Sequence, residues 1–226
     1  MGSLAELPAP RGLPRGRGSL PASEVARAQR DRMLRAMTAA VAELGYGNVR
    51  ITDVVDKARV SRQSFYAQFA DKEECFLAAH ERGIRLVLDR VQDSAAGQTA
   101  SRPDEQLRAG LATYLEMTAE EPEFAHCMLI ELQAIGPRGL EARLAGHRRI
   151  ALVLGAWHEG VRQARTKWPA VSPERYAAAV GAVHDLVFDL VAQGRSQEAP
   201  GLEPQAFEAV RRLLEIPPPP RGPSRS

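Results

Sequence analysis

The side chains best suited to chemistry lie together in residues 58–74, which read ARVSRQSFYAQFADKEE. Ser61, Arg62, Gln63 and Ser64 place hydrogen-bonding groups side by side. An arginine suits the O6 and N7 atoms of guanine, and a glutamine suits N6 and N7 of adenine, each through paired hydrogen bonds. The composition of this segment therefore favours contact with the edges of bases or with phosphates.

Three aromatic residues fall within five positions of the same segment, although aromatic residues make up only 5% of the chain. Phe65 and Phe69 are four residues apart and share one face of a helix. We expect them to pack inward against Val54 and Val55. Tyr66 lies between them in sequence and points elsewhere, with its hydroxyl group available to a phosphate.

Two short helices position these side chains. The pattern predicts a first helix that begins at Ser23 and ends at Gly45, a second over 52–58 with Thr52 as its cap, and a third over 61–69 with Ser61 as its cap. A fourth begins at Asp71. The short link between the second and third helices is typical of a helix-turn-helix, whose second helix enters the major groove of DNA.

The rest of the chain shows helical spacing and no sustained alternation of the kind a strand requires. The expected helices are 71–94, 103–119, 122–135, 138–165, 173–194 and 204–215. We therefore predict an all-α protein: an N-terminal three-helix bundle with a helix-turn-helix, followed by a larger helical domain. The expected divisions are a disordered basic arm (1–22), a DNA-binding domain (23–70), a larger helical domain (71–216) and a disordered tail (217–226).

Charge is unevenly distributed over the 226 residues, whose net charge is +2. Residues 1–70 contain eleven basic and six acidic residues, whereas the remainder contains nineteen and twenty-two. This basic excess agrees with a polyanionic partner for the N-terminal third. No apolar run approaches the roughly 20 residues of a membrane helix, and the first twenty residues lack the apolar centre of a secretory signal. We expect a cytoplasmic protein without a membrane partner.

The segment ITDVVDKARVSRQSFYAQFADKEECF resembles the DNA-binding signature of the TetR family of bacterial transcriptional regulators. The resemblance covers residues 28–80. It implies phosphate contacts by Thr52, Tyr66 and Lys72. Base contacts fall by position to the start of the third helix, with the candidates Ser61, Arg62, Gln63, Ser64 and Gln68.

One residue departs from the family pattern. The turn between the two helices usually carries glycine, because the backbone there adopts a positive φ, and this chain has Arg59. A non-glycine residue in that conformation costs roughly 1 kcal/mol. Arg59 either contacts a phosphate or is simply solvated. The PRGRG stretch of the arm, residues 14–18, either reaches into a minor groove or adds general attraction to DNA.

The same resemblance, with the length of the larger domain, implies a small-molecule effector. Two histidines lie in otherwise apolar helical segments, and acidic residues follow on the same helices. They are either hydrogen-bonded interior groups or polar groups lining a ligand cavity, and we favour the cavity. The candidate ligand-binding residues are His126, Glu131, Trp157, His184 and Phe188. Trp157 and Phe188 are most simply core residues, and lining of the cavity is their second interpretation.

Dimerisation is expected through the last two long helices, because one helix-turn-helix reads only a few base pairs. Small residues at Ala178, Gly181 and Ala182 permit close approach of helices. Phe207, Val210 and Leu214 form an apolar stripe on the final helix. Together they predict a four-helix interface between two subunits of a homodimer.

Other classes of function fit less well. The chain has no nucleophile motif, no phosphate-binding glycine loop and no paired metal ligands, so we predict that it is not an enzyme and carries no cofactor or metal. The prediction is a transcriptional regulator, and more specifically a repressor, that binds a palindromic DNA operator and is released by its effector. The alternatives are a DNA-binding protein without a ligand and a redox-sensing regulator that uses Cys75 and Cys127.

Overall fold

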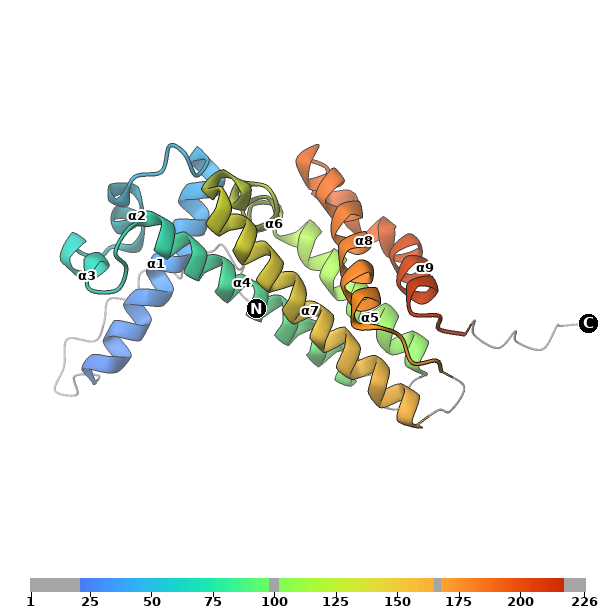
Figure 1. Cartoon of the computed structure of the whole chain (residues 1–226). Helices are drawn as coiled ribbons and strands as arrows, with labels where there is room; N and C mark the ends of the chain where they lie inside the picture. Colours follow the sequence, from blue (N-terminus) through green and yellow to red (C-terminus); the bar gives the residue numbers. More distant parts are fainter. Residues whose placement is uncertain (1–20, 98–101, 165–167, 218–226) are drawn as a thin grey trace, which may run out of the picture. The chain divides into compact units, whose positions relative to one another are not determined.

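A computed structural model describes residues 21–97, 102–164 and 168–217. All regular structure in these ranges is helical (Figure 1), which confirms the all-α prediction. The predictions for most of the basic arm, including PRGRG, and for nearly all of the C-terminal tail concern residues outside these ranges. No helix in the described ranges is long and apolar enough to cross a membrane.

Most helices follow the expected segments, but the helix expected over 61–69 ends at Tyr66. Their bounds are α1 (Ala22–Leu44), α2 (Ile51–Ala58), α3 (Arg62–Tyr66), α4 (Lys72–Gly97), α5 (Pro103–Glu120), α6 (Pro122–Leu129), α7 (Pro137–Ala164), α8 (Pro173–Ala192) and α9 (Glu203–Leu213). Two short 3₁₀ helices join them: η1 (Glu131–Ile135) and η2 (Ser196–Leu202). The segment expected as one helix over 122–135 is thus divided, and η2 was not anticipated.

One compact unit contains residues up to Ile84 together with 121–142. Within it, α1, α2 and α3 form the predicted three-helix bundle, and α6 with η1 packs in the same unit. Its core consists of fully buried apolar side chains from several helices, among them Met33, Met37, Val41, Val54, Phe65, Phe69 and Phe76. The expected burial of Phe65 on α3 and of Phe69, three residues beyond the end of α3, is therefore confirmed.

The second compact unit contains residues 85–120 and the chain from Arg143 onward. Its core is built by α5, α8 and α9 from Leu107, Ala179, Val183, Ala206, Phe207, Val210, Leu214 and Ile216. Helices α4 and α7 each contribute one part to the first unit and one part to the second.

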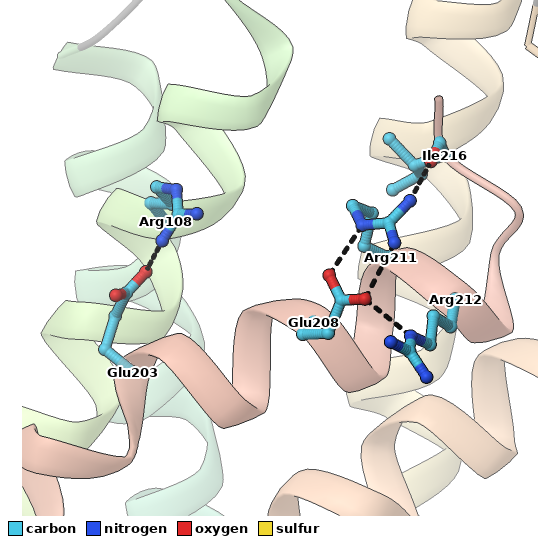
Figure 2. A network of polar contacts seen from close by, with 6 residues as sticks. All are labelled: Arg108, Glu203, Glu208, Arg211, Arg212 and Ile216. Atoms are coloured by element: carbon cyan, nitrogen blue, oxygen red, sulfur yellow. Dashed lines mark hydrogen bonds and ion pairs between the residues drawn. The ribbon is translucent and has the colours of Figure 1, made fainter. Parts of the chain in front are cut away.

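Polar contacts hold α9 in this second unit (Figure 2). Glu203 at its start pairs with Arg108 of α5 at 2.5 Å, and the Arg108 guanidinium lies 3.6 Å from the centre of the Phe207 ring. Near its end, Glu208 pairs with Arg211 at 2.7 Å, and Arg211 donates to the Ile216 carbonyl at 3.0 Å. The Arg108 contacts join the start of α9 to α5, and the Glu208 and Arg211 contacts close its C-terminal end on the residues that follow it.

Candidate nucleic-acid interface and interior polar clusters

Helix α3 begins where the sequence predicts. The Ser61 side chain accepts a hydrogen bond from the backbone N–H of Ser64 at 3.0 Å, and the two hydroxyl groups lie 2.9 Å apart. This cap leaves Arg62 and Gln63 exposed on the first turn. These two side chains are free to meet base edges, whereas the hydroxyls of Ser61 and Ser64 are engaged with each other.

The aromatic residues of α3 divide as predicted between core and surface. Phe65 and Phe69 are 0% and 1% exposed, and their ring centroids lie 5.4 Å apart. Tyr66 is 57% exposed. Together with Arg59, Arg62 and Gln63 it forms an exposed polar group at α3, which we call the α3 face.

The turn before α3 has the backbone conformation that the sequence predicts. Arg59 has φ 53° and ψ 50°, in the left-handed region. The N–H of Val60 donates to the Val55 carbonyl at 3.1 Å, and that of Arg59 donates to Asp56 at 3.2 Å. This pair of hydrogen bonds is the Schellman arrangement, which closes α2 and turns the chain into α3.

Thr52 is not the cap of α2. The helix begins one residue earlier, at Ile51, and the Asp53 carboxylate accepts from the backbone N–H of Arg50 at 2.8 Å. Asp53, in the first turn of the helix, thus provides the hydrogen-bond acceptor for the backbone N–H of Arg50 at the start of the helix. Thr52 lies half-buried in that turn, and its phosphate contact stays a prediction.

Lys72 is engaged within its own unit. Its ammonium donates to the carbonyls of Tyr46, Val49 and Gly47 at 2.9, 3.0 and 3.4 Å. It also lies 4.6 Å from the centre of the Tyr46 ring. Because an ammonium has three N–H donors, a phosphate contact by Lys72 requires exchange of one of these bonds.

Gln68, two residues after the end of α3, is hydrogen-bonded to α1. Its side-chain amide donates to the Ala26 carbonyl at 3.0 Å, and its own backbone carbonyl accepts from Arg30 at 3.3 Å. The Arg30 guanidinium also covers the Phe69 ring at 4.3 Å. This network orients the end of α3 and leaves base contact mainly to Arg62 and Gln63.

The five predicted ligand residues belong to two different units. His126 and Glu131 are in the first unit, where His126 Nε2 lies 3.5 Å from Glu131 Oε1 and Glu131 Oε2 accepts from the Tyr46 N–H at 2.7 Å. The remaining three are in the second unit. There the Trp157 indole donates to Gln106 at 3.1 Å and packs edge-on against Trp168.

His184 lies in a polar cluster that the sequence did not predict as a whole. Its ring stacks on Phe188 and lies 4.6 Å from the ring of His147 on α7. Arg143 Nη2 and Asp185 Oδ1 approach its Nδ1 to 3.5 and 3.4 Å. Burial, followed by the charge of Arg143, lowers the pKa of His184, so its ring is held neutral. Arg143 and His147 are one helical turn apart in the sequence, and this spacing was the signal from which the cluster could have been predicted.

The two cysteines are free and fully buried. Burial raises the pKa of Cys75 to about 12 and that of Cys127 well above its ordinary value. Both remain thiols at neutral pH, which disfavours the redox alternative, since the thiolate is the reactive form. In the described ranges, no cluster of three histidine, cysteine or acidic residues could hold a metal ion.

The predicted dimer residues separate into two groups. Ala178 is exposed, Gly181 and Ala182 are half-buried, and no atom lies within 4 Å of where a side chain on Gly181 would begin. Phe207, Val210 and Leu214 are 3%, 2% and 0% exposed in the core of their own unit. The apolar stripe of α9 therefore faces its own chain, and the interface prediction is retained only for α8.

Comparison with known proteins agrees with this geometry. Residues 34–79 match the family model described as bacterial regulatory proteins, tetR family, and this match covers the second half of α1, all of α2 and α3, and the start of α4. The N-terminal part of the chain is thus similar to the TetR family. No sequence among curated proteins matches it.

Solved structures of TetR-like fold cover most of the chain. The fatty acid degradation regulator FadR from Bacillus halodurans has a TM-score of 0.71 at 14% identity, over 83% of this chain and 96% of that chain. A putative TetR-family regulator from Mesorhizobium loti has a TM-score of 0.69 at 17% identity, over 84% and 97%. FadR from Bacillus subtilis, in complex with stearoyl-CoA, has a TM-score of 0.68 at 14% identity, over 81% and 96%. The TetR-family fold thus extends through both units.

Proposed function

We propose that this protein is a TetR-family transcriptional regulator, a repressor that binds a palindromic operator as a homodimer. The observation that carries the proposal is the α3 face, on which Arg62 and Gln63 stand exposed beyond the Ser61 cap. Tyr66 and Arg59 flank them with groups suited to phosphates. Because the proposed partner is DNA, we also propose a cytoplasmic location.

Operator binding is tested with a duplex selected from a random library by the purified full chain. Arg62→Ala and Gln63→Ala should each relax the preference at particular base pairs, at a cost of about 1–3 kcal/mol for a paired contact. Tyr66→Phe should weaken binding to all sequences alike. If the chain selects no sequence, or if these variants bind like the wild type, the α3 face is not the reading surface.

Homodimerisation is proposed through the open side of α8. Small residues let two helices approach closely, and Ala178, Gly181 and Ala182 lie on accessible positions of that helix. Ala178→Glu with Ala182→Glu should give monomers in sedimentation while helical content is retained. Val210→Glu is the contrasting variant: it buries a charge in the chain's own core and should lose fold rather than partner. A double variant that stays dimeric would place the interface elsewhere.

We further propose that a small molecule with an anionic group releases the operator. Arg143, His147 and His184 supply a guanidinium and two imidazoles within one cluster, beside the Phe188 ring. The Arg143 guanidinium suits a carboxylate or a phosphate, and a neutral imidazole can add one N–H donor. A fold relative, the Bacillus subtilis FadR, is found with stearoyl-CoA, which makes an acyl-CoA a natural first probe.

Matched amphiphiles test this effector class. Octanoate, octyl phosphate and octanol share one chain length and differ in the head group, and stearoyl-CoA adds a larger anion. The anions should raise the melting temperature by mass action and octanol should not. Arg143→Met should abolish the difference. If no probe binds while operator binding is intact, the alternative of a DNA-binding protein without a ligand is favoured.

A further inference from the structure

The turn between α1 and α2, residues 45–50, sets where the helix-turn-helix begins. Tyr46 in this turn is buried, with 8% exposure, and its ring stacks on Phe76 of α4 at 5.2 Å. Gly45 has φ 74°, so the backbone reverses sharply at the end of α1. Any displacement of this turn is passed along the backbone to α2 and then to α3.

A carboxylate from outside the three-helix bundle holds one side of this turn. Glu131 Oε2 accepts a hydrogen bond from the backbone N–H of Tyr46 at 2.7 Å. The Glu131 side chain is only 20% exposed, and its other oxygen lies 3.5 Å from His126 Nε2. A buried backbone donor bound by a carboxylate is among the stronger hydrogen bonds in proteins.

An ammonium holds the other side. Lys72 donates to the carbonyls of Tyr46, Gly47 and Val49, as described above. The backbone donor of Tyr46 is therefore taken by an anion and its acceptor by a cation. The turn is fixed by two charged side chains, and Glu131 comes from a segment some 85 residues further along the chain.

The segment that carries Glu131 is itself well anchored in the first unit. A side chain on Gly83 of α4 would begin 2.7 Å from the Phe124 ring, so α6 packs directly on that helix. Arg138 pairs with Glu73 at 2.7 Å. The packing of its own segment therefore holds the Glu131 carboxylate in place beside the turn.

We propose that Glu131 is a positioning residue for DNA recognition, which holds the α1–α2 turn so that α3 lies correctly for the operator. The proposal rests on operator binding through the α3 face. The proposal predicts that removal of Glu131 lowers operator affinity. Electrostatics alone predicts the opposite, because removal of a carboxylate from a DNA-binding unit should strengthen its attraction to phosphates. A loss of operator affinity on removal of Glu131 is thus a specific signature of positioning.

The experiment compares Glu131→Ala and Glu131→Gln with Glu123→Ala in the full chain. Glu123 is an exposed carboxylate on α6, so its removal changes the net charge by the same amount. Glutamine keeps an oxygen that accepts from the Tyr46 N–H and loses the charge. Each protein is titrated with the library-selected duplex and with a scrambled duplex of equal length, under conditions in which circular dichroism shows it folded.

Glu131→Ala should lower affinity for the selected duplex by about 2- to 30-fold relative to Glu123→Ala, the range found for residues that act through others. Affinity for the scrambled duplex should match that of Glu123→Ala, and the salt slope should not change, because Glu131 neutralises no phosphate. Glu131→Gln should retain affinity for the selected duplex. Hydrogen exchange of the Tyr46 amide should accelerate in Glu131→Ala only.

Two results would overturn the proposal. One is a Glu131→Ala protein that binds the selected duplex as tightly as Glu123→Ala does. The other is an equal loss on selected and scrambled duplexes, which would indicate a general structural defect. Failure of the wild-type chain to select any duplex is a separate result, because it bears on DNA binding itself and not on Glu131.

Discussion

At the scale of single residues, Arg59 adopts a backbone conformation that glycine usually supplies. Its φ of 53° lies in the left-handed region, where a side chain costs about 1 kcal/mol or more. Its side chain is exposed beside α3. An arginine at this position is explained if its guanidinium contributes more free energy to DNA binding than the strained turn costs in stability.

Arg59→Gly should therefore stabilise the fold and weaken DNA binding together. Unfolding by denaturant should show a gain of up to about 1 kcal/mol, since glycine adopts this conformation without a steric penalty. DNA titrations at several salt concentrations should show a slope reduced by about one phosphate contact. Arg59→Lys is the control, because it keeps both charge and strain. A Gly variant with an unchanged salt slope would mean that Arg59 is only solvated.

His80 gives the fold a dependence on pH. The side chain is 5% exposed on α4, and burial lowers its pKa from 6.5 to about 4. Between these values the unfolded chain binds a proton that the folded chain does not, so stability falls as pH decreases through this window. The loss amounts to about 3 kcal/mol at most, from 1.36 kcal/mol per pKa unit.

This prediction is checked by the free energy of unfolding of the wild type and of His80→Gln between pH 7 and 4. The wild type should lose more stability than the variant over this range, and above pH 6.5 the difference between them should be constant. Parallel curves over the whole range would show that His80 takes up its proton equally well in the folded chain.

At the scale of elements, the division between α6 and η1 is a tertiary effect. Residues 122–135 have a continuous helical pattern, and neither glycine nor proline interrupts them after Pro122. The chain nevertheless leaves the α-helix after Leu129, and Glu131 turns toward the Tyr46 N–H. Gly139 permits this arrangement, since the start of a side chain there would lie 2.1 Å from the Leu132 carbonyl oxygen.

Two glycine-to-alanine changes on α7 should therefore have opposite effects. Gly139→Ala forces η1 away from the start of α7 and should destabilise the fold by about 1–3 kcal/mol, as overpacking does. Gly160→Ala, which has no atom within 4 Å of the new methyl group, should stabilise it by up to about 1 kcal/mol through helix propensity. Thermal unfolding of both variants measures this. Stabilisation by Gly139→Ala would show that η1 shifts at no cost.

The sequence was sufficient wherever local pattern decides the structure. The cap at Ser61, the left-handed Arg59 and the inward and outward aromatics of α3 follow from residues close together in the chain. Contacts between distant segments were not predictable in this way. The three carbonyl partners of Lys72 lie more than twenty residues away, and the burial of Leu214 depends on how α9 packs against α5 and α8.

At the scale of the whole molecule, α4 and α7 belong to both compact units. Helix α4 carries Lys72 at its start and ends in the second unit, while α7 follows η1 and continues to the cluster at Arg143 and His147. If a ligand binds the Arg143 cluster, as proposed, two continuous helices join its site to the first unit. The coupling requires that the ligand bind the two DNA-binding states with different affinity.

Linkage makes this coupling measurable from either side. If an anionic effector lowers operator affinity by some factor, saturating operator must lower effector affinity by the same factor, typically about 5- to 150-fold. Octanoate, octyl phosphate and stearoyl-CoA should each be titrated with and without saturating selected duplex. Arg143→Met should lose effector binding yet keep operator affinity, because Arg143 lies in the second unit and the α3 face lies in the first. Glu131→Ala should retain effector binding. A probe that binds equally well with and without operator is no inducer, and the Arg143 cluster would then serve only to pair α7 with α8.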